Sequence, residues 1–157
     1  MLFKSVFVLF AAAATFGVNA APLEVRQIGN LECNINRFQI VTDLSSAKTA
    51  VGKLGAAAPI ASNTTAAAAV QAVTDGISGA QGAIGVIGKA LLKLQAAPAE
   101  ARDQVQGNLT SAQNALDSIT PASVSSNDTS TLGLLSDAQS KLNDAITAGL
   151  NVVANCK

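Results

Sequence analysis

The side chains that most enzymes use for catalysis are scarce in this 157-residue chain. It contains no histidine, so it can form neither a Ser–His nor a Cys–His nucleophile pair and offers no imidazole to a metal. Two carboxylates could act together as an acid–base pair, which is the arrangement that a hydrolase would need. The Asp and Glu residues are scattered, however, and most fall opposite the apolar stripes of the predicted helices, as solvated helix faces do. We therefore expect no enzyme activity, no cofactor and no metal site.

Nucleic acid is also an unexpected partner. Ten Lys and Arg residues balance ten Asp and Glu residues, so the chain has no net charge with which to attract phosphates. It has no basic patch with interleaved aromatic residues, and no Gly-Lys-Ser/Thr loop that would cradle a phosphate. The remaining candidates for chemistry are two cysteines and three asparagines.

The two cysteines, Cys33 and Cys156, lie near the two ends of the domain. In an oxidising compartment such a pair most simply forms one disulfide, although two free thiols or an intermolecular bridge would also fit the sequence. A bridge that closes so long a loop should stabilise the fold by about 4–5 kcal/mol in the chain-entropy model.

Three Asn-X-Ser/Thr sequons predict N-glycosylation at Asn63, Asn108 and Asn127. Asn63 and Asn127 fall in segments whose composition is typical of loops, which favours their use. Asn108 falls inside a predicted helix, so its use is less favoured. Glycans at these positions would be solubilising surface features.

The first residues of the chain predict the export that a disulfide and glycans require. Residues 1–20 carry one lysine, then an apolar run, then small residues, which is typical of a secretory signal peptide cut between Ala20 and Ala21. A membrane anchor is the alternative, but the run is too short to span a bilayer. Residues 21–29 have no apolar period and form a short N-terminal extension or a pro-segment. Residues 30–157 are then one extracellular, secreted domain with no transmembrane anchor, and the cell wall is one destination for it.

The elements that position these residues follow from the spacing of the apolar side chains, which recur every three or four residues. This spacing predicts four long helices, over residues 31–54, 65–94, 98–119 and 130–153. Small and polar residues predict connections at 55–64, 95–97 and 120–129. No segment shows the alternation of a strand, so the fold class is an all-α antiparallel bundle of four to five helices. An even number of long helices would bring Cys33 and Cys156 to the same end, where one disulfide could tie the ends together.

The second predicted helix contains a glycine at every third position from 76 to 88. Each glycine costs about 1 kcal/mol relative to alanine, so we expect this helix to bend, fray or split between Gly79 and Gly85. One interpretation is close packing against a neighbouring helix together with a kink. The other is a deformable wall that lets apolar material enter the bundle. The sequence leaves both open.

Once the signal peptide is removed, Phe38 is the only aromatic residue, so the side chains available to fill the core are thin. Either the helices approach closely or a cavity remains between them. In the second case a set of apolar side chains on the first two helices would face a bound lipid: Phe38, Val73, Ile77, Ile84, Ile87 and Leu91.

The short Ala-Pro segment, the Arg-Gln junction and the Ala-rich helical domain also carry a family resemblance. They lie at Ala21-Pro22, at Arg26-Gln27 and along the run from Phe38 to Leu44. With them, the chain resembles fungal hydrophobic surface-binding protein A and the related cell-wall galactomannoproteins. The resemblance implies a secreted or wall-associated helical domain that adsorbs to hydrophobic surfaces, with some relatives holding fatty acids inside the bundle and with no catalytic residues. Hydrophobins with eight cysteines are excluded by the cysteine count.

The favoured hypothesis is thus a secreted, non-enzymatic protein that binds a hydrophobic surface, cell-wall material or a lipid such as a fatty acid. The alternative is a glycosylated structural or host-interaction protein without a small ligand.

Overall fold

The computed structural model describes residues 31–124 and 128–156, and these residues form helices and short connections without a strand. The helices, in chain order, are α1 (Leu31–Ala56), α2 (Ala58–Ser62), α3 (Thr64–Leu92), α4 (Ala99–Asp117), the 3₁₀ helix η3 (Pro121–Val124) and α5 (Thr129–Asn155). The predicted all-α bundle is confirmed. Two predicted connections are more ordered than expected, because 55–64 contains α2 and 120–129 contains η3.

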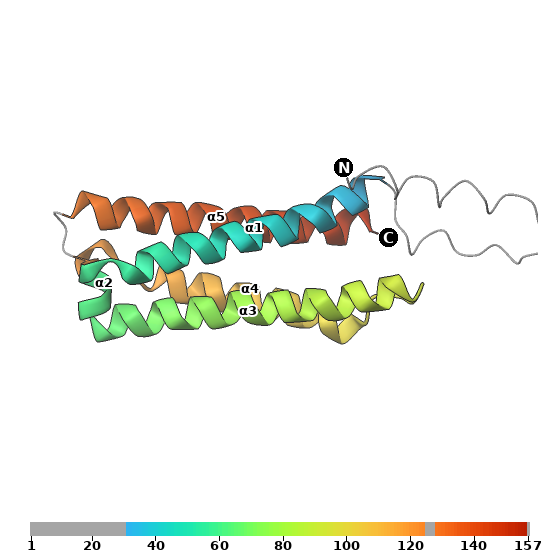
Figure 1. Cartoon of the computed structure of the whole chain (residues 1–157), viewed down its shortest axis with the longest axis horizontal. Coiled ribbons are helices and arrows are strands. Elements are labelled where there is room, and N and C mark those ends of the chain that lie inside the picture. Colours follow the sequence, from blue (N-terminus) through green and yellow to red (C-terminus); the bar gives the residue numbers. More distant parts are fainter. Residues whose placement is uncertain (1–30, 125–127, 157) are drawn as a thin grey trace, which may run out of the picture.

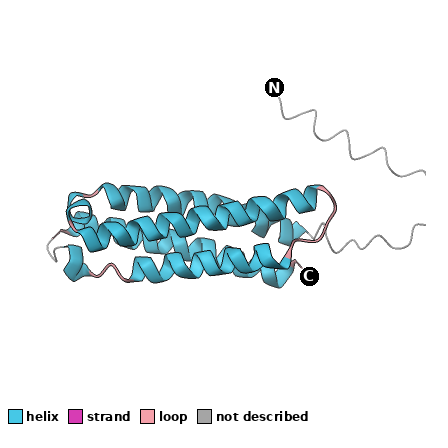
Figure 2. Cartoon of the chain, turned by 90° about the horizontal axis from the view of Figure 1, so that it is seen from below, coloured by secondary structure: helices cyan, strands magenta, loops and turns pink. Residues whose placement is uncertain are grey.

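The four long helices run antiparallel in two pairs (Figure 1). Helix α1 lies along α5, and α3 lies along α4, and these are the two most extensive contacts between elements. The contact between α1 and α3 is smaller, and the contact between α4 and α5 is smaller still. Figure 2 shows the same helices from below, all aligned with the long axis of the bundle. The α1–α5 pair therefore rests on the α3–α4 pair, and the core lies between them.

The core is packed most heavily in the middle of the bundle and toward α2. The large side chains with less than 2% exposure lie there: Leu44, Leu54, Ile60, Ile77, Leu116, Leu142, Val51, Val73 and Val124. Those in the four long helices sit on apolar stripes with three- or four-residue spacing, so burial of one stripe per long helix explains their arrangement. Val124 of η3 and Ile60 of α2 close the core at that end.

Side-chain caps fix the starts of two helices. Oδ1 of Asn63 accepts the backbone N–H groups of Thr65 and Ala66 at 3.1 and 3.0 Å, which starts α3. Asp128 caps the start of α5. Its Oδ1 accepts the backbone N–H of Thr131 at 3.0 Å, and its Oδ2 accepts the hydroxyl of Thr131 at 2.7 Å. These hydrogen bonds from Thr131 lower the pKa of the Asp128 carboxyl. Pro98, which we expected as the first helical residue, is the N-cap of α4.

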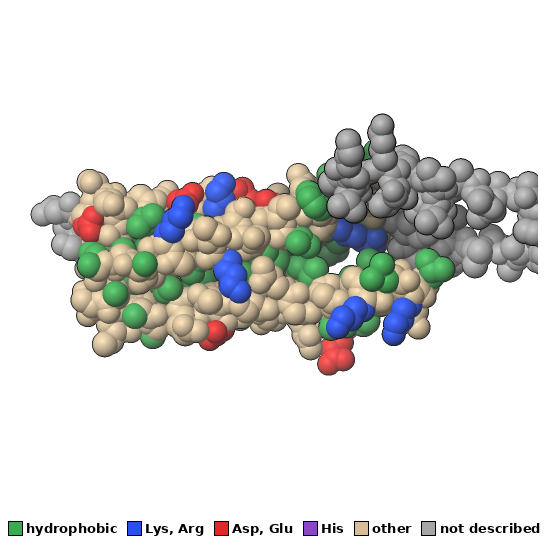
Figure 3. All heavy atoms as spheres, viewed as in Figure 1, with side chains coloured by type: hydrophobic (Ala, Val, Ile, Leu, Met, Phe, Trp, Pro, Cys, Tyr) green, Lys and Arg blue, Asp and Glu red, His purple; other side chains and the backbone are tan. Residues whose placement is uncertain are grey.

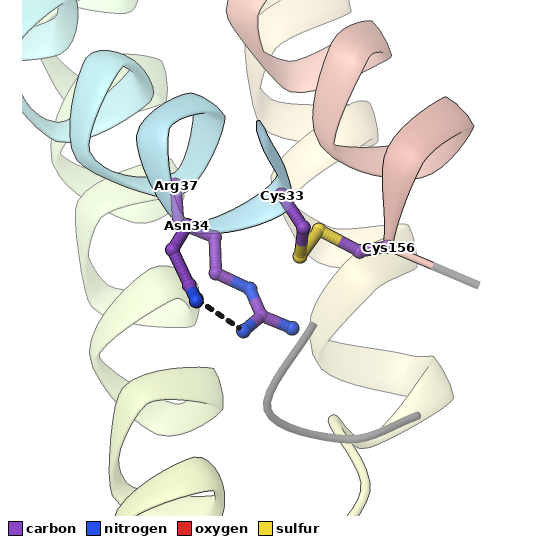
Figure 4. The surroundings of a disulfide bond; sticks show 4 residues. All are labelled: Cys33, Asn34, Arg37 and Cys156. Atoms are coloured by element: carbon purple, nitrogen blue, oxygen red, sulfur yellow. Dashed lines mark hydrogen bonds between the residues drawn. A yellow bond between two sulfur atoms is a disulfide. The ribbon is translucent and has the colours of Figure 1, made fainter. Parts of the chain in front are cut away.

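The predicted disulfide is confirmed. Cys33, near the start of α1, is bonded to Cys156, which directly follows α5, and their Cα atoms are 5.0 Å apart (Figure 4). Neither cysteine is free, so the two alternatives of free thiols and an intermolecular bridge do not apply. Four long antiparallel helices return the chain to its starting end, which is why two residues 123 positions apart can meet.

The glycines of α3 serve in two different ways. The helix runs unbroken from Thr64 to Leu92, so it does not split between Gly79 and Gly85. A Cβ at Gly76 would stand 2.8 Å from the carbonyl oxygen of Asn108 on α4, and a Cβ at Gly79 would stand 2.8 Å from the Asn108 side chain. These two glycines therefore let α3 and α4 approach closely. A Cβ at any of the other three glycines (Gly82, Gly85 and Gly88) would meet no atom within 4 Å.

We expect alanine substitutions in these two groups of glycines to change the free energy of unfolding in opposite directions. Gly82→Ala should raise the free energy of unfolding by about 0.5–1 kcal/mol, because alanine favours the helix and has room. Gly76→Ala should lower it by about 1–3 kcal/mol, because its Cβ would force α3 and α4 apart. Urea unfolding followed by far-UV circular dichroism measures both. Stabilisation of equal size by the two variants would contradict the close contact.

Candidate functional site

The exposed large apolar side chains gather in one half of the bundle, the half that ends at the disulfide. They occupy the first turns of α1, the last turns of α3 with the residue two positions beyond it, and the last turns of α5. We call this set the apolar end: Leu31, Ile35, Phe38, Val41, Val86, Leu92, Leu94, Leu150 and Val153. Within the described residues, the half that contains α2 exposes no side chain of this size and kind. Exposed large apolar side chains that gather in one part of a protein are typical of a contact site.

A cavity of about 470 Å³ lies between the two helix pairs in this half of the bundle. All four long helices line it with apolar side chains: Ile40, Ile84, Ile87, Leu91, Val105 and Val152. Figure 3 shows a hollow between the pairs, with hydrophobic and basic side chains around it. The volume falls within the range of about 300–1,000 Å³ that is usual for small-molecule sites.

Small residues explain why the core stays unfilled here. Gly88 of α3 and the linker residues Ala96 and Ala97 line the cavity where the other half of the bundle has Leu, Ile or Val. The two pairs remain joined along their packed half, so the missing volume appears as a cavity rather than as a collapse of the helices.

A groove of about 400 Å³ runs between α4 and α5, the long helices with the smallest contact among the neighbouring pairs. It adjoins the cavity, because both are lined by Arg102, Val105, Gly149 and Val153. The cavity therefore extends to the side of the bundle where α4 and α5 separate.

Two arginines from opposite helix pairs line the cavity, Arg37 on α1 and Arg102 on α4. Arg37 is half-buried, and its Nη1 donates to Oδ1 of Asn34 at 3.2 Å (Figure 4). Burial lowers the pKa of the Arg37 guanidinium, because a charged group loses hydration there. No Asp or Glu is found among the described residues that line the cavity.

Leu94 holds a backbone conformation that leucine rarely adopts, with φ of 57°. It follows α3 in a Schellman motif, in which Gln95 N–H donates to the carbonyl of Ala90 and Leu94 N–H donates to that of Leu91, both at 2.9 Å. Glycine is the usual residue at this position, because a Cβ is strained at positive φ. The side chain of Leu94 is 73% exposed, so it gains little from packing. The strained backbone of Leu94 therefore lowers stability, and it places a large apolar side chain in solvent at the apolar end.

The structure distributes the predicted lipid-facing residues among three places. Ile84, Ile87 and Leu91 line the cavity. Val73 and Ile77 are fully buried in the packed core and are absent from the described lining. Phe38 points outward at the apolar end and is 71% exposed. Sequence reasoning missed Arg37, Arg102 and Leu94.

The sequons differ in their surroundings. Asn63 is half-buried as the cap of α3, and its Nδ2 donates to the carbonyl of Ser123 at 3.0 Å. Asn108 is half-buried, and its side chain packs against Gly79, so a glycan there would have to displace this contact. Asn127 lies outside the described residues, as do the predicted cleavage site at Ala20 and Ala21 and the extension at 21–29.

Comparisons of the chain with protein-family models, curated proteins and solved structures found no match. None of the described helices is both long and apolar enough to cross a bilayer. The described residues also contain no cluster of three His, Cys, Asp or Glu side chains that could hold a metal. The apolar end and the cavity are therefore the features of the described residues that bear on function.

Replacing Leu94 should show that its conformation is strained. Leu94→Gly should raise the free energy of unfolding by about 1 kcal/mol, because glycine adopts positive φ without a steric cost. Leu94→Asn should have a smaller effect of the same sign, and Leu92→Ala, at an exposed helical position, should be nearly neutral. Thermal and urea unfolding of the variants provide the measurement. A clear loss of stability in Leu94→Gly would mean that the Leu94 side chain packs favourably where it lies.

Proposed function

We propose that the protein is a secreted, non-enzymatic binder of hydrophobic material, which adsorbs to apolar surfaces or cell-wall material and takes an apolar chain, such as that of a fatty acid, into its cavity. One observation carries the proposal: the exposed large apolar side chains gather in the same half of the bundle as the apolar cavity. If the cavity were only a poorly packed part of the core, there would be no reason for leucine and phenylalanine side chains to be exposed to solvent in the same half of the bundle.

The exposed side chains supply enough free energy for adsorption. A large apolar side chain gains about 1.5–3 kcal/mol when it is fully removed from water. Phe38, Leu92 and Leu94 are 71%, 86% and 73% exposed, so their contact with an apolar surface would contribute roughly 3–7 kcal/mol. With the neighbouring apolar residues, this is sufficient for micromolar binding.

The cavity supports the uptake of a chain in the same way. Each methylene group that leaves water for an apolar cavity contributes about 0.8 kcal/mol. The cavity wall formed by α3 carries Gly88 between Ile87 and Leu91, and glycine has weak helix propensity. A wall of this kind can adjust to chains of different length, which is the second of the two roles expected for the glycines.

Adsorption should depend on the apolar end and not on the rest of the surface. The triple variant Phe38→Ser, Leu92→Ser, Leu94→Ser should bind an alkyl-coated sensor at least tenfold more weakly than the wild type, as loss of the estimated contact energy requires. A quartz crystal microbalance gives the binding curves, and circular dichroism checks that the helices remain.

A matched control replaces three exposed alanines in the opposite half, in the variant Ala56→Ser, Ala61→Ser, Ala68→Ser. It should adsorb as the wild type does. Equal adsorption by the wild type and the first triple variant would refute a role for the apolar end and would favour a glycosylated structural protein without a ligand.

Uptake of a chain should be blocked by filling the cavity from α3. Gly88 lines the cavity and a Cβ there meets no atom, so Gly88→Leu would place its side chain in the empty space. We expect palmitate to bind this variant about tenfold or more weakly, because leucine occupies the volume of several methylene groups. Displacement of a fluorescent fatty acid measures the loss.

Gly85→Leu is the matched control for this test. It makes the same exchange in the same helix, but Gly85 is exposed and is absent from the described lining. Palmitate should bind it as tightly as it binds the wild type. Undiminished binding to Gly88→Leu would show that the chain does not enter this cavity.

A further inference from the structure

Helix α1 begins with a short apolar ridge on the side that faces away from the core. Leu31, Ile35 and Phe38 follow one another at i, i+4 and i+7, and all three are exposed. They lie within about 60° of one another around the helix, opposite to the buried residues Ile40 and Leu44. This is the spacing with which an amphipathic helix fills an apolar groove on a partner. We call these three residues the α1 ridge.

The groove between α4 and α5 has a form that matches this ridge. Its apolar lining includes two half-buried residues, one buried residue and two exposed ones: Val105, Ile146, Leu109, Leu150 and Val153. On α5, Ile146, Leu150 and Val153 repeat the spacing i, i+4 and i+7, so the ridge and this wall of the groove both extend about 10.5 Å along a helix. Toward the half with α2, Nε2 of Gln113 donates to Oδ1 of Asn143 at 3.3 Å and ties α4 to α5. The groove opens from this hydrogen bond toward the disulfide end.

The ridge of a molecule cannot fill the groove of the same molecule. Helix α5 packs along α1, and the ridge lies on the side of α1 opposite to its buried residues. The ridge is therefore accessible only to something outside the bundle. Among the described residues, no other helix exposes three large apolar side chains at this spacing.

Charged residues beside the two surfaces are complementary in one orientation. Glu32 is exposed next to the ridge in the first turn of α1, and Arg102 is exposed at the disulfide end of the groove. When two molecules lie with their disulfide ends pointing the same way, Glu32 of one lies at the Arg102 end of the other's groove. Asp103 also lies at that end, but it is about 120° around α4 from Leu109, whereas Arg102 is about 20° from it and thus nearer to the groove. In the reverse orientation Glu32 would meet a part of the described lining that has no cation.

We infer that copies of this protein associate side by side, with the α1 ridge of one copy in the α4–α5 groove of the next and Glu32 beside Arg102. A second copy is the occupant that fits, because it supplies a ridge of the right length, apolar character and charge. Since two unlike surfaces meet, the contact repeats from copy to copy and builds open chains or rings. The inference goes beyond the proposed function, because this contact needs neither an adsorbing surface nor a bound lipid.

The contact is small, so association should be weak in solution. The exposed parts of the ridge and of Leu150 and Val153 amount to roughly three whole side chains, which is about half of the apolar area that a standard interface buries. Interfaces of this size form weak or transient complexes. We expect the disulfide-bonded mature protein to be monomeric at about 10 µM and to form larger species toward about 1 mM, as sedimentation velocity would show.

Single substitutions test the two surfaces separately. Ile35→Glu places a charge in the ridge, and Leu150→Glu places one in the groove. Each should weaken association about tenfold or more, because a charge in an apolar contact loses hydration. Both side chains are exposed in the single molecule, so the variants should fold, which circular dichroism checks.

Two controls exclude general effects of charge and of exposed apolar surface. Ala68→Glu adds the same charge at an exposed position of α3 outside both surfaces. The double variant Leu92→Ser, Leu94→Ser removes two exposed leucines that belong to neither the ridge nor the groove. Both controls should associate as the wild type does. A loss of association in either control equal to that in Ile35→Glu would overturn the inference.

Mixing the two single variants tests whether unlike surfaces meet. Ile35→Glu keeps an intact groove and Leu150→Glu keeps an intact ridge, so an equimolar mixture should form one-to-one dimers. These dimers should not grow, because their remaining ridge and groove are the substituted ones. A mixture that stays monomeric would show that the ridge does not bind the groove.

A charge exchange tests the orientation. Glu32→Arg should weaken association, and Arg102→Glu in the same chain should restore it, because the two charges have then exchanged places. Failure of the second change to restore association would overturn the proposed orientation.

A photo-cross-linker identifies what occupies the groove. p-Benzoylphenylalanine in place of Leu150 should cross-link to residues 31–38 of another molecule, and mass spectrometry of mixed labelled and unlabelled protein distinguishes this from a link within one chain. Cross-links to residues 21–29 of the same chain, or a wild type that stays monomeric at about 1 mM, would overturn the inference. Neither result would affect adsorption to an alkyl-coated sensor, and failure to adsorb would leave the sedimentation result unchanged.

Discussion

The covalent bond between Cys33 and Cys156 joins the start of α1 to the end of α5 at the end of the bundle where the core is thinnest. Many of the large side chains at this end only border the cavity or are turned toward solvent, so burial holds this end less than the other. A bridge across 123 residues stabilises the folded chain by about 4–5 kcal/mol in the chain-entropy model, which is comparable to the burial of two or three large side chains. The bond thus allows the bundle to keep a cavity where a well-packed core would otherwise be needed.

The same residue type gives opposite results in the two halves of α3. Gly76 and Gly79 meet the backbone and side chain of Asn108, and this approach leaves no space between α3 and α4. Farther along, the three-residue spacing has turned the glycines away from α4, because a step of three residues falls about 60° short of a full turn of the helix. Gly82 and Gly85 then face open space and Gly88 faces the cavity. The same three-residue repeat therefore places glycines at the close contact between α3 and α4, in open space and at the cavity.

Much of the fold followed from the sequence. The apolar period predicted the four long helices with ends that differ by only a few residues, such as 31–54 against Leu31–Ala56. The pair of cysteines predicted the disulfide, and the even number of long helices showed that it was feasible. The short helices α2 and η3 were not predicted, because one helical turn contains too few apolar positions to show a period.

The cavity was harder to predict than the fold. Val73 and Ile84 lie on the same sequence pattern, yet only Ile84 lines the cavity, since filling depends on what the opposite helices provide. The conformation of Leu94 depends on hydrogen bonds at the end of α3 that its residue type does not predict. Arg37 and Arg102 are brought together only by the packing of the two pairs.

The exposed apolar side chains lie toward one end of the bundle, and this decides how many molecules would cover a given area of an oily surface. A helix of 27 residues such as α5 is about 40 Å long, and the molecule is far narrower than it is long. Molecules of this shape that attach by one end stand upright and side by side, so each needs only the area of its cross-section. The half that contains α2, with Asn63 at its connection to α3, would then face outward. An oily surface covered in this way would present polar side chains to the surroundings and would become wettable.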